Sequence, residues 1–258
     1  MNEQSQMELV PRGYQLARFD QLDSTNLEAR RRAADLTANA SPIWLVAAEQ
    51  SAGRGRHGRH WHSPRGNLFA TLLLPRMELR RAHELAFVAG LALRAALADF
   101  VPPPHRLELK WPNDILLDEK KLCGILLESG APDGAGASWL ALGMGVNLVA
   151  HPEESAWPAT SLAHALPAAP SLEEVLAAVT HGFAAQHRFW QRAGFAAVRA
   201  AWLTHAWRRG GSVQVRAGAE ILRGRFRTLD ASGALCLETG QGERVVLAGD
   251  MFFEKARA

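Results

Sequence analysis

The 258-residue sequence contains only two cysteines, and it has no long apolar segment. Cys123 and Cys236 lie far apart in segments of different pattern, so we expect two free thiols in a reducing compartment. Neither cysteine has the local spacing of a metal site, and the ten histidines form no HExxH pair, which argues against a structural metal. No apolar run reaches the roughly 18 residues of a membrane helix, and the polar N-terminus lacks the apolar core of a signal peptide. These absences predict a cytoplasmic protein that binds no membrane.

Charge of one sign is not in large excess either, because the formal net charge is +3. Much of the positive excess sits in two arginine-rich stretches, residues 30–32 and residues 54–59. This distribution favours a local anion-binding site over a surface that coats nucleic acid. Hydrophobic residues make up 48% of the chain, which is enough for a large buried core.

A glycine- and arginine-rich segment, GRGRHGRHW from Gly53 to Trp61, separates two apolar runs at residues 43–48 and 67–74. It has no aliphatic side chain, which predicts a loop between two strands. Glycines let backbone N–H groups approach a ligand, and arginine side chains bind phosphate or carboxylate through two parallel hydrogen bonds. A dinucleotide-binding fold is excluded because a strand rather than a helix follows, and a kinase because the chain has no HRD or DFG triplet. A solvated basic hairpin remains the structural alternative.

The N-terminal part predicts a disordered lead-in over residues 1–14, a strand over residues 16–22 and a helix from Ser24 to about Ala40. Thr25-Asn26-Leu27-Glu28 matches the capping box of a helix start. A cap would give Ser24, Thr25 and Asn26 a structural role, and the triplet alone favours it. The alternative is that two hydroxyls and an amide beside a helix N-terminus bind a polar ligand.

The middle of the chain predicts a helix over residues 81–100 and strands over residues 106–111, 115–118, 120–128 and 139–148, with a tight turn at residues 112–114 and a loose turn at residues 130–136. Gly124 lies inside an otherwise regular strand, where glycine often marks a ligand or a second backbone passing close by. Successive strands joined by turns indicate a largely antiparallel sheet flanked by helices.

The C-terminal part begins with a Pro- and Ala-rich segment, residues 150–170, that we expect to wrap the surface. A second capping box, Ser171 to Glu174, predicts a helix to about Trp190, and another helix is expected over residues 195–207. The aromatic residues of these helices are interpreted as core packing. From residue 210 five short strands punctuated by glycines predict a small barrel.

Five signals follow one another along the chain: Ser24-Thr25-Asn26, Gln50 with GRGRHGR and Trp61, Lys110-Trp111-Pro112-Asn113-Asp114, Lys121-Leu122-Cys123-Gly124-Ile125-Leu126, and Gly145-Val146-Asn147. Their order and spacing closely resemble the biotin protein ligases, the biotin–[acetyl-CoA-carboxylase] ligases, over about residues 15–258. The combination of GRGRxGR, KWPND and KxxGIL is much more specific than any single piece.

The resemblance implies an α/β (α+β) fold: a synthetase-like catalytic domain over residues 15–209, with a mixed, largely antiparallel sheet flanked by helices, then an SH3-like β-barrel over residues 210–258. It implies that biotin, ATP and Mg²⁺ are used to make biotinoyl-5′-AMP and pyrophosphate. A lysine of the biotin carboxyl carrier domain of acetyl-CoA carboxylase, or of a related carboxylase, then takes the biotin. We expect a monomer or a weak homodimer.

The resemblance also implies roles for individual residues. Arg56 and Lys121 are the implied catalytic residues, placed at the carboxylate and the α-phosphate. The implied biotin-binding residues are Ser24, Thr25, Asn26, Gln50, Gly53, Arg54, Gly55, Arg56, Lys121 and Gly124. The implied ATP-binding residues are Arg56, Arg59, Trp61, Lys110, Asn113 and Asn147, with Trp61 against the adenine. Asp114 either holds Mg²⁺ through water or caps a turn.

The sequence departs from the family pattern at two points. His57 stands where an arginine is common, and we expect little effect because Arg56 and Arg59 remain. Few residues precede Ser24, so we expect no winged helix-turn-helix and a ligase without DNA binding. Two alternatives stay open: a lipoate ligase or octanoyltransferase with the same chemistry, and a basic module that binds RNA with steep salt dependence.

Overall fold

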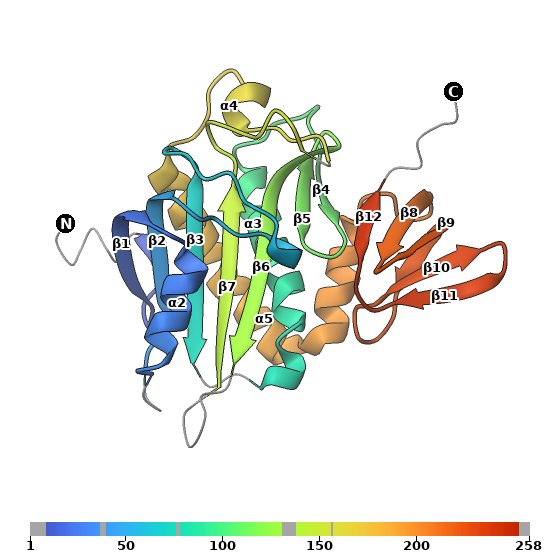
Figure 1. Cartoon of the computed structure of the whole chain (residues 1–258), viewed down its shortest axis with the longest axis horizontal. Coiled ribbons are helices and arrows are strands. Elements are labelled where there is room, and N and C mark those ends of the chain that lie inside the picture. Colours follow the sequence, from blue (N-terminus) through green and yellow to red (C-terminus); the bar gives the residue numbers. More distant parts are fainter. Residues whose placement is uncertain (1–8, 37–39, 76–77, 131–137, 156, 253–258) are drawn as a thin grey trace.

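The centre of the molecule is a seven-stranded mixed sheet (Figure 1). This computed structural model describes residues 9–36, 40–75, 78–130, 138–155 and 157–252. The strand order is β1-β2-β3-β7-β6-β5-β4. Only β1 and β2 run parallel, so the expected largely antiparallel sheet is confirmed. The strands are β1 (Gln15–Leu22), β2 (Ile43–Gln50), β3 (Leu68–Pro75), β4 (Leu107–Lys110), β5 (Asp114–Leu117), β6 (Lys120–Gly130) and β7 (Trp139–Val146).

Helices cover both faces of this sheet, because the strands alternate between two apolar faces. On one face α2 (Thr25–Ala33) buries Ala29 and Ala33 against Leu45, Leu73 and Ala141. On the other face lie α3 (Glu84–Ala98) and α5 (Leu172–Thr204), which Figure 1 shows behind the sheet. A short helix, α4 (Leu162–Ala165), follows β7.

The predicted break between two C-terminal helices is present inside α5. Gly194 has φ 74° and ψ 174°, which no helical residue adopts, so α5 consists of two helical segments. The capping box at its start is confirmed, since Ser171 Oγ accepts from the backbone N–H of Glu174 and the Glu174 side chain accepts from that of Ser171. The second segment ends at Thr204, before the expected Trp207.

The expected N-terminal helix differs from the structure in length and in its cap. α2 ends at Ala33 rather than near Ala40, and part of the difference, residues 37–39, lies outside the described residues. The capping box proposed for Thr25 is wrong, because Ser24 is the N-cap and its side chain makes no cap hydrogen bond. Thr25 and Asn26 are only 4% exposed and turn toward the sheet, so their polar atoms bond to strand residues instead.

The C-terminal part forms a five-stranded antiparallel sheet in the order β11-β10-β9-β8-β12. The expected five strands are all present, although no pairing joins β11 to β12 in the described residues. Both sheets share one hydrophobic core, and Trp111 Nε1 donates to the Gly233 carbonyl at 3.1 Å between them. The strands are β8 (Ser212–Ala217), β9 (Glu220–Leu229), β10 (Leu235–Thr239), β11 (Gly242–Val246) and β12 (Asp250–Phe252).

The structure also bears on the cysteines and on two segments outside the main strands and helices. Cys123 and Cys236 are both free and buried, as expected. The segment over residues 150–170 does more than wrap the surface, because Trp157, Thr160 and Leu162 are buried in it. The expected turn over residues 130–136 lies almost entirely outside the described residues. Within the described ranges, no helix has the length and apolar composition needed to cross a membrane.

Candidate active site

One cavity of about 470 Å³ opens on the face of the seven-stranded sheet that carries α2. Its wall comes from the glycine-rich loop, from β6 and β7, from the segment after β7, and from β12 of the second sheet. Every site residue predicted from the sequence lines it except Gly53. A Cβ on Gly53 would lie 2.2 Å from Ser63 Oγ, so glycine here lets the two limbs of the loop pack together.

The glycine-rich loop joins β2 to β3 and is folded by its own backbone. The Gly53 carbonyl accepts from the Trp61 N–H at 2.9 Å, and the Gly55 N–H donates to the Arg59 carbonyl at 2.7 Å. Between them His57 turns the chain with φ 57°, a left-handed conformation that is uncommon for a side chain other than Asn, Asp or His. The loop therefore presents its arginines from a tight turn rather than from an extended chain.

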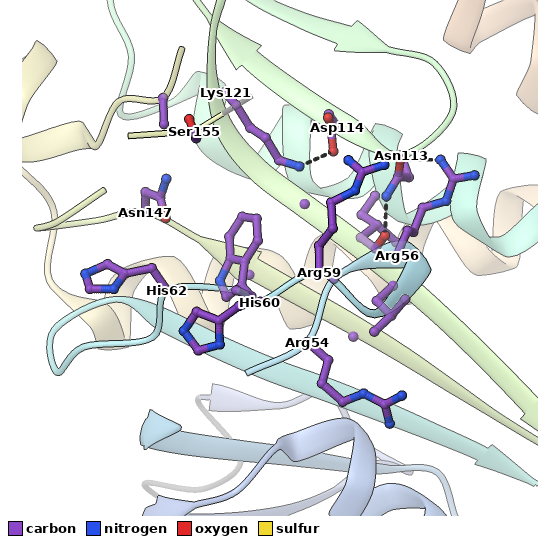
Figure 2. A pocket seen from close by; sticks show the side chains of 18 of the residues that line it. Arg54, Arg56, Arg59, His60, His62, Asn113, Asp114, Lys121, Asn147 and Ser155 are labelled. Carbon is purple, nitrogen blue, oxygen red and sulfur yellow. Dashed lines mark hydrogen bonds and ion pairs between the residues drawn. The ribbon is translucent and has the colours of Figure 1, made fainter. Parts of the chain in front are cut away.

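Two arginines of the loop are held by the second sheet. Arg56 Nη1 lies 3.3 Å from Asp250 Oδ1 and donates to the Gly249 carbonyl at 3.1 Å, and Arg59 forms an ion pair with the other oxygen of Asp250. Arg54 behaves differently, because it faces Glu128 at 3.6 Å. Figure 2 shows Arg54 pointing away from the group formed by Arg56, Arg59 and Lys121.

A buried carboxylate organises the two lysines. Asp114 Oδ1 lies 2.6 Å from Lys121 Nζ, and Asp114 Oδ2 accepts from Lys110 Nζ at 3.1 Å. Burial alone would raise the pKa of Asp114, but Lys121 and Lys110 outweigh it and lower the pKa to about 2. Asp114 is therefore ionised at neutral pH, and it fixes two ammonium groups at the edge of the cavity.

The other end of the cavity is lined mainly by neutral hydrogen-bonding side chains, among them Thr25, Asn26 and Gln50. The backbone N–H of Thr25 donates to Gln50 Oε1 at 2.8 Å, and Gln50 Nε2 donates to Ser63 Oγ at 3.0 Å. Thr71 Oγ1 lies 2.7 Å from both Thr25 Oγ1 and Asn26 Oδ1. This chain of neutral donors and acceptors suits a polar, uncharged ligand group.

The indole of Trp61 lines the cavity and rests on the sheet beside Lys121. A Cβ on Gly145 or Gly124 would come within 2.6 and 2.8 Å of the ring, so both glycines make room for it on the sheet. Lys121 Nζ lies 5.2 Å from the ring centroid. The buried Nε1 of Trp61 faces Gly145 and has no acceptor among the described residues.

The two predicted nucleotide-site asparagines already bond to protein groups. Asn113 Nδ2 donates to the Ile125 carbonyl at 2.6 Å, and its Oδ1 accepts from Arg56 Nη1 at 3.3 Å. Asn147 Nδ2 donates to the Thr160 carbonyl at 3.1 Å and so ties the segment after β7 to the sheet. Both side chains line the cavity while holding parts of its wall in place.

Comparisons with known proteins agree with this geometry. Residues 18–147 match the Biotin/lipoate A/B protein ligase family, and residues 210–254 match the Biotin protein ligase C terminal domain. A Biotin--[acetyl-CoA-carboxylase] ligase of Paracoccus denitrificans is 42% identical over 237 residues, which cover 90% of this chain and 97% of the relative. This chain belongs to the biotin protein ligase family.

Further members of the biotin protein ligase family are similar to this chain over most of its length. The Biotin--[acetyl-CoA-carboxylase] ligase of Mycobacterium tuberculosis is 34% identical over 239 residues, covering 90% of this chain and 86% of the relative. The solved structure of the biotin protein ligase from Aquifex aeolicus in complex with biotin and ATP superposes with a TM-score of 0.77 at 27% identity. The superposition covers 92% of this chain and 97% of the Aquifex aeolicus chain.

Some residues of this biotin protein ligase cavity have no signal in the sequence. Asp250 and Phe252 line the cavity from a strand that the sequence assigns to a separate barrel. Trp157 lines it from the Pro- and Ala-rich segment, with Lys110 Nζ 4.4 Å from its ring centroid. For Trp157 the sequence offers only its large apolar side chain, which indicates that residues 150–170 pack against the rest of the protein.

Asp114 does not fit the expected role of a Mg²⁺ ligand. Each of its oxygens already faces a lysine ammonium group, which would repel a divalent cation. In the described part of the chain, no group of three or more His, Cys, Asp or Glu side chains could hold a metal ion. Nor does the structure show the alternative role, since the polar partners of Asp114 are the two lysines rather than backbone amides of a turn.

Proposed function

We propose that this chain is an ATP-dependent biotin protein ligase that first makes biotinoyl-5′-AMP and then biotinylates one lysine of a carrier domain. In the first step a biotin carboxylate oxygen bonds to the α-phosphorus of ATP, and pyrophosphate leaves. In the second step the lysine nitrogen bonds to the acyl carbon, AMP leaves, and the nitrogen loses a proton. The carrier is expected to be the biotin carboxyl carrier domain of acetyl-CoA carboxylase or of a related carboxylase.

One observation carries this proposal: a single cavity joins an end lined by neutral hydrogen-bonding side chains to a cluster of four cations. The neutral end, lined by Thr25, Asn26 and Gln50, suits the ureido ring of biotin, which both donates and accepts hydrogen bonds. The cations Arg56, Arg59, Lys110 and Lys121 line the same cavity, and they would neutralise the carboxylate and the triphosphate there. Two anions repel each other, so their neutralisation by fixed cations favours the reaction.

Individual roles follow from these positions. Lys121 is proposed to bridge the carboxylate and the α-phosphate, because Asp114 fixes its amine at the edge of the cavity beside Trp61. Arg56 and Arg59 are proposed to bind phosphate oxygens with the N–H groups that Asp250 leaves unused. Trp61 is proposed to separate the biotin side from the nucleotide side, with Gly124 and Gly145 beneath it.

The remaining residues are proposed to shape the two halves of the site. Ser24, Gln50 and the loop residues Gly53, Arg54 and Gly55 would form the biotin side, and Arg54 would do so through Glu128 rather than by reaching the carboxylate. Asn113 and Asn147 would hold the nucleotide side. We propose residues 15–209 as the catalytic domain and residues 210–258 as a second domain that completes its site.

Exchange of labelled pyrophosphate into ATP tests the first step directly. We expect exchange that depends on biotin and that lipoate or octanoate does not support, which separates biotin ligation from the other activities of this family. Incubation with biotin, MgATP and an apo carrier domain should then add the mass of one biotinyl group to one lysine. Exchange with lipoate but not with biotin would overturn the proposal.

A further inference from the structure

The amide of Asn26 has its orientation fixed by two groups that can only accept hydrogen bonds. Its Nδ2 donates to Glu128 Oε2 at 2.8 Å and to the Leu126 carbonyl at 3.3 Å. A carboxylate and a carbonyl cannot donate, so only the nitrogen of the amide can face them. The amide oxygen must therefore point to the opposite side.

That opposite side is formed by Thr71 of β3 and Gly143 of β7, and Gly143 lines the cavity. A Cβ on Gly143 would lie 2.1 Å from Asn26 Oδ1, so the missing side chain at this position makes room for the amide oxygen. Both residues line the cavity, and Asn26 is only 4% exposed. A ligand at this point meets a buried oxygen rather than an N–H group.

One lone pair of this oxygen is still open. Thr71 Oγ1 lies 2.7 Å from Asn26 Oδ1 and has a single proton to donate. The amide oxygen cannot donate, so the proton in this contact comes from Thr71 Oγ1. An amide oxygen accepts two hydrogen bonds, which leaves one for an N–H or O–H of the ligand.

We infer that Glu128 is a positioning residue that aims the amide oxygen of Asn26 into the cavity and thereby selects a ligand with an N–H donor there. Glu128 does not line the cavity, and its other recorded contact is Arg54 at 3.6 Å, so it reaches the ligand through Asn26. The inference rests on the proposed function, since the ligand with the matching donor is the ureido ring of biotin. It adds a residue of β6, outside the five sequence motifs, to the determinants of specificity.

The alternative is that Glu128 merely pairs with Arg54 and steadies the loop. Two variants of nearly the same shape separate these roles. Glu128→Gln removes the charge that pairs with Arg54 but keeps a side-chain oxygen that can accept from Asn26 Nδ2. Glu128→Met removes both, so that only the Leu126 carbonyl at 3.3 Å opposes a flipped amide.

The experiment measures the Kd for biotin by calorimetry without ATP, together with KM and kcat in biotin-dependent pyrophosphate exchange. We expect Glu128→Met to raise Kd and KM for biotin about tenfold or more, with kcat and the KM for ATP within about twofold of the parent. Glu128→Gln should stay within about threefold of the parent in every constant. The inference is overturned if Glu128→Met binds biotin like the parent, or if Glu128→Gln loses as much affinity as Glu128→Met.

A reciprocal exchange keeps the test decisive if Glu128→Met does not fold. Asn26→Asp places a carboxylate oxygen against Glu128 and should lose biotin affinity. Adding Glu128→Gln to it supplies an N–H that can donate to Asp at position 26, and biotin affinity should recover about tenfold. No recovery would contradict the inference, whereas a parent protein that does not bind biotin at all would contradict the proposed function instead.

Discussion

Asp250 Oδ1 lies 3.3 Å from Arg56 Nη1, so a strand of the five-stranded sheet holds an arginine of the glycine-rich loop. The hydrogen bonds recorded for the Arg56 side chain within the described residues all use Nη1, with acceptors on Asn113, Gly249 and Asp250. The Nε–Nη2 edge of the guanidinium group is left for a ligand, and this is the edge that binds phosphate through two parallel hydrogen bonds. The second sheet therefore supplies part of the cavity wall and orients an arginine of the loop.

Neutralising Asp250 should weaken nucleotide binding. Asp250→Asn removes the charge that orients both Arg56 and Arg59, so we expect the KM for ATP to rise about three- to tenfold while the KM for biotin changes little. Pyrophosphate exchange at varied ATP and at varied biotin measures both constants. Glu220→Gln is a matched control, because it breaks an exposed ion pair with Arg244 in the same sheet, and it should leave both constants unchanged. An unchanged or lower KM for ATP in Asp250→Asn would contradict this role.

Removing the guanidinium group of Arg56 should let the adenylate escape. Arg56→Gly takes away one of the cations that neutralise the phosphate, so biotinoyl-5′-AMP should dissociate and react with stray lysines. The measurement is biotin incorporated into a bystander protein such as serum albumin. His57→Gly is the control on the same loop, because His57 already has φ 57°, which suits glycine, and its side chain does not line the cavity. The same amount of bystander label from Arg56→Gly and from the parent would contradict the prediction.

Adding a methyl group beneath Trp61 should displace the indole. The Cβ of Gly124→Ala would lie 2.8 Å from the ring, which is closer than van der Waals contact allows. We expect kcat/KM for adenylate formation to fall about tenfold or more, since the wall between the two halves of the cavity shifts. Gly240→Ala is the control, because nothing lies within 4 Å of its Cβ position, and it should retain parental activity. Parental activity in Gly124→Ala would show that the indole moves freely.

The parts of this fold that were predictable from the sequence are those fixed by local chemistry. The alternating apolar strands, the Ser171–Glu174 capping box and the break near Gly194 each depend on neighbours a few residues away, and all three are present. The capping box predicted at Thr25–Glu28 is wrong for the opposite reason, because distant contacts decide the structure there. Thr25 and Glu28 have the spacing of a capping box, but contacts with Gln50 and Thr71 across the sheet outweigh the local hydrogen bond that the spacing predicts.

The same distinction applies to the site. The predicted site residues, apart from Gly53, line one cavity. The residues that hold these side chains in place lie far from them in the sequence. Glu128 lies near the end of β6, and no sequence pattern connects it with Asn26. Asp250 lies in the second sheet, and no sequence pattern connects it with Arg56. Only the three-dimensional structure shows these two contacts.

The two ion pairs that buried Asp114 makes with Lys110 and Lys121 should make the free energy of unfolding depend on pH in the acid range. The folded-state pKa of Asp114, about 2, lies below the ordinary value of 3.8 for an aspartate, so its contribution to stability is fully present above about pH 4 and is lost as the pH falls through 2. Asp114→Asn leaves two ammonium groups without their carboxylate, and we expect the free energy of unfolding at pH 7 to fall by about 3–5 kcal/mol. Urea unfolding of parent and variant at pH 7, 4 and 2.5 measures the difference, which should shrink as the pH drops. Asp20→Asn is the control: its ion pair with Arg65 is exposed, so the unfolding midpoint should hardly change at pH 7. A difference between Asp114→Asn and the parent that grows toward low pH would contradict the assignment, because it would mean that the protonated Asp114 is the form the fold stabilises.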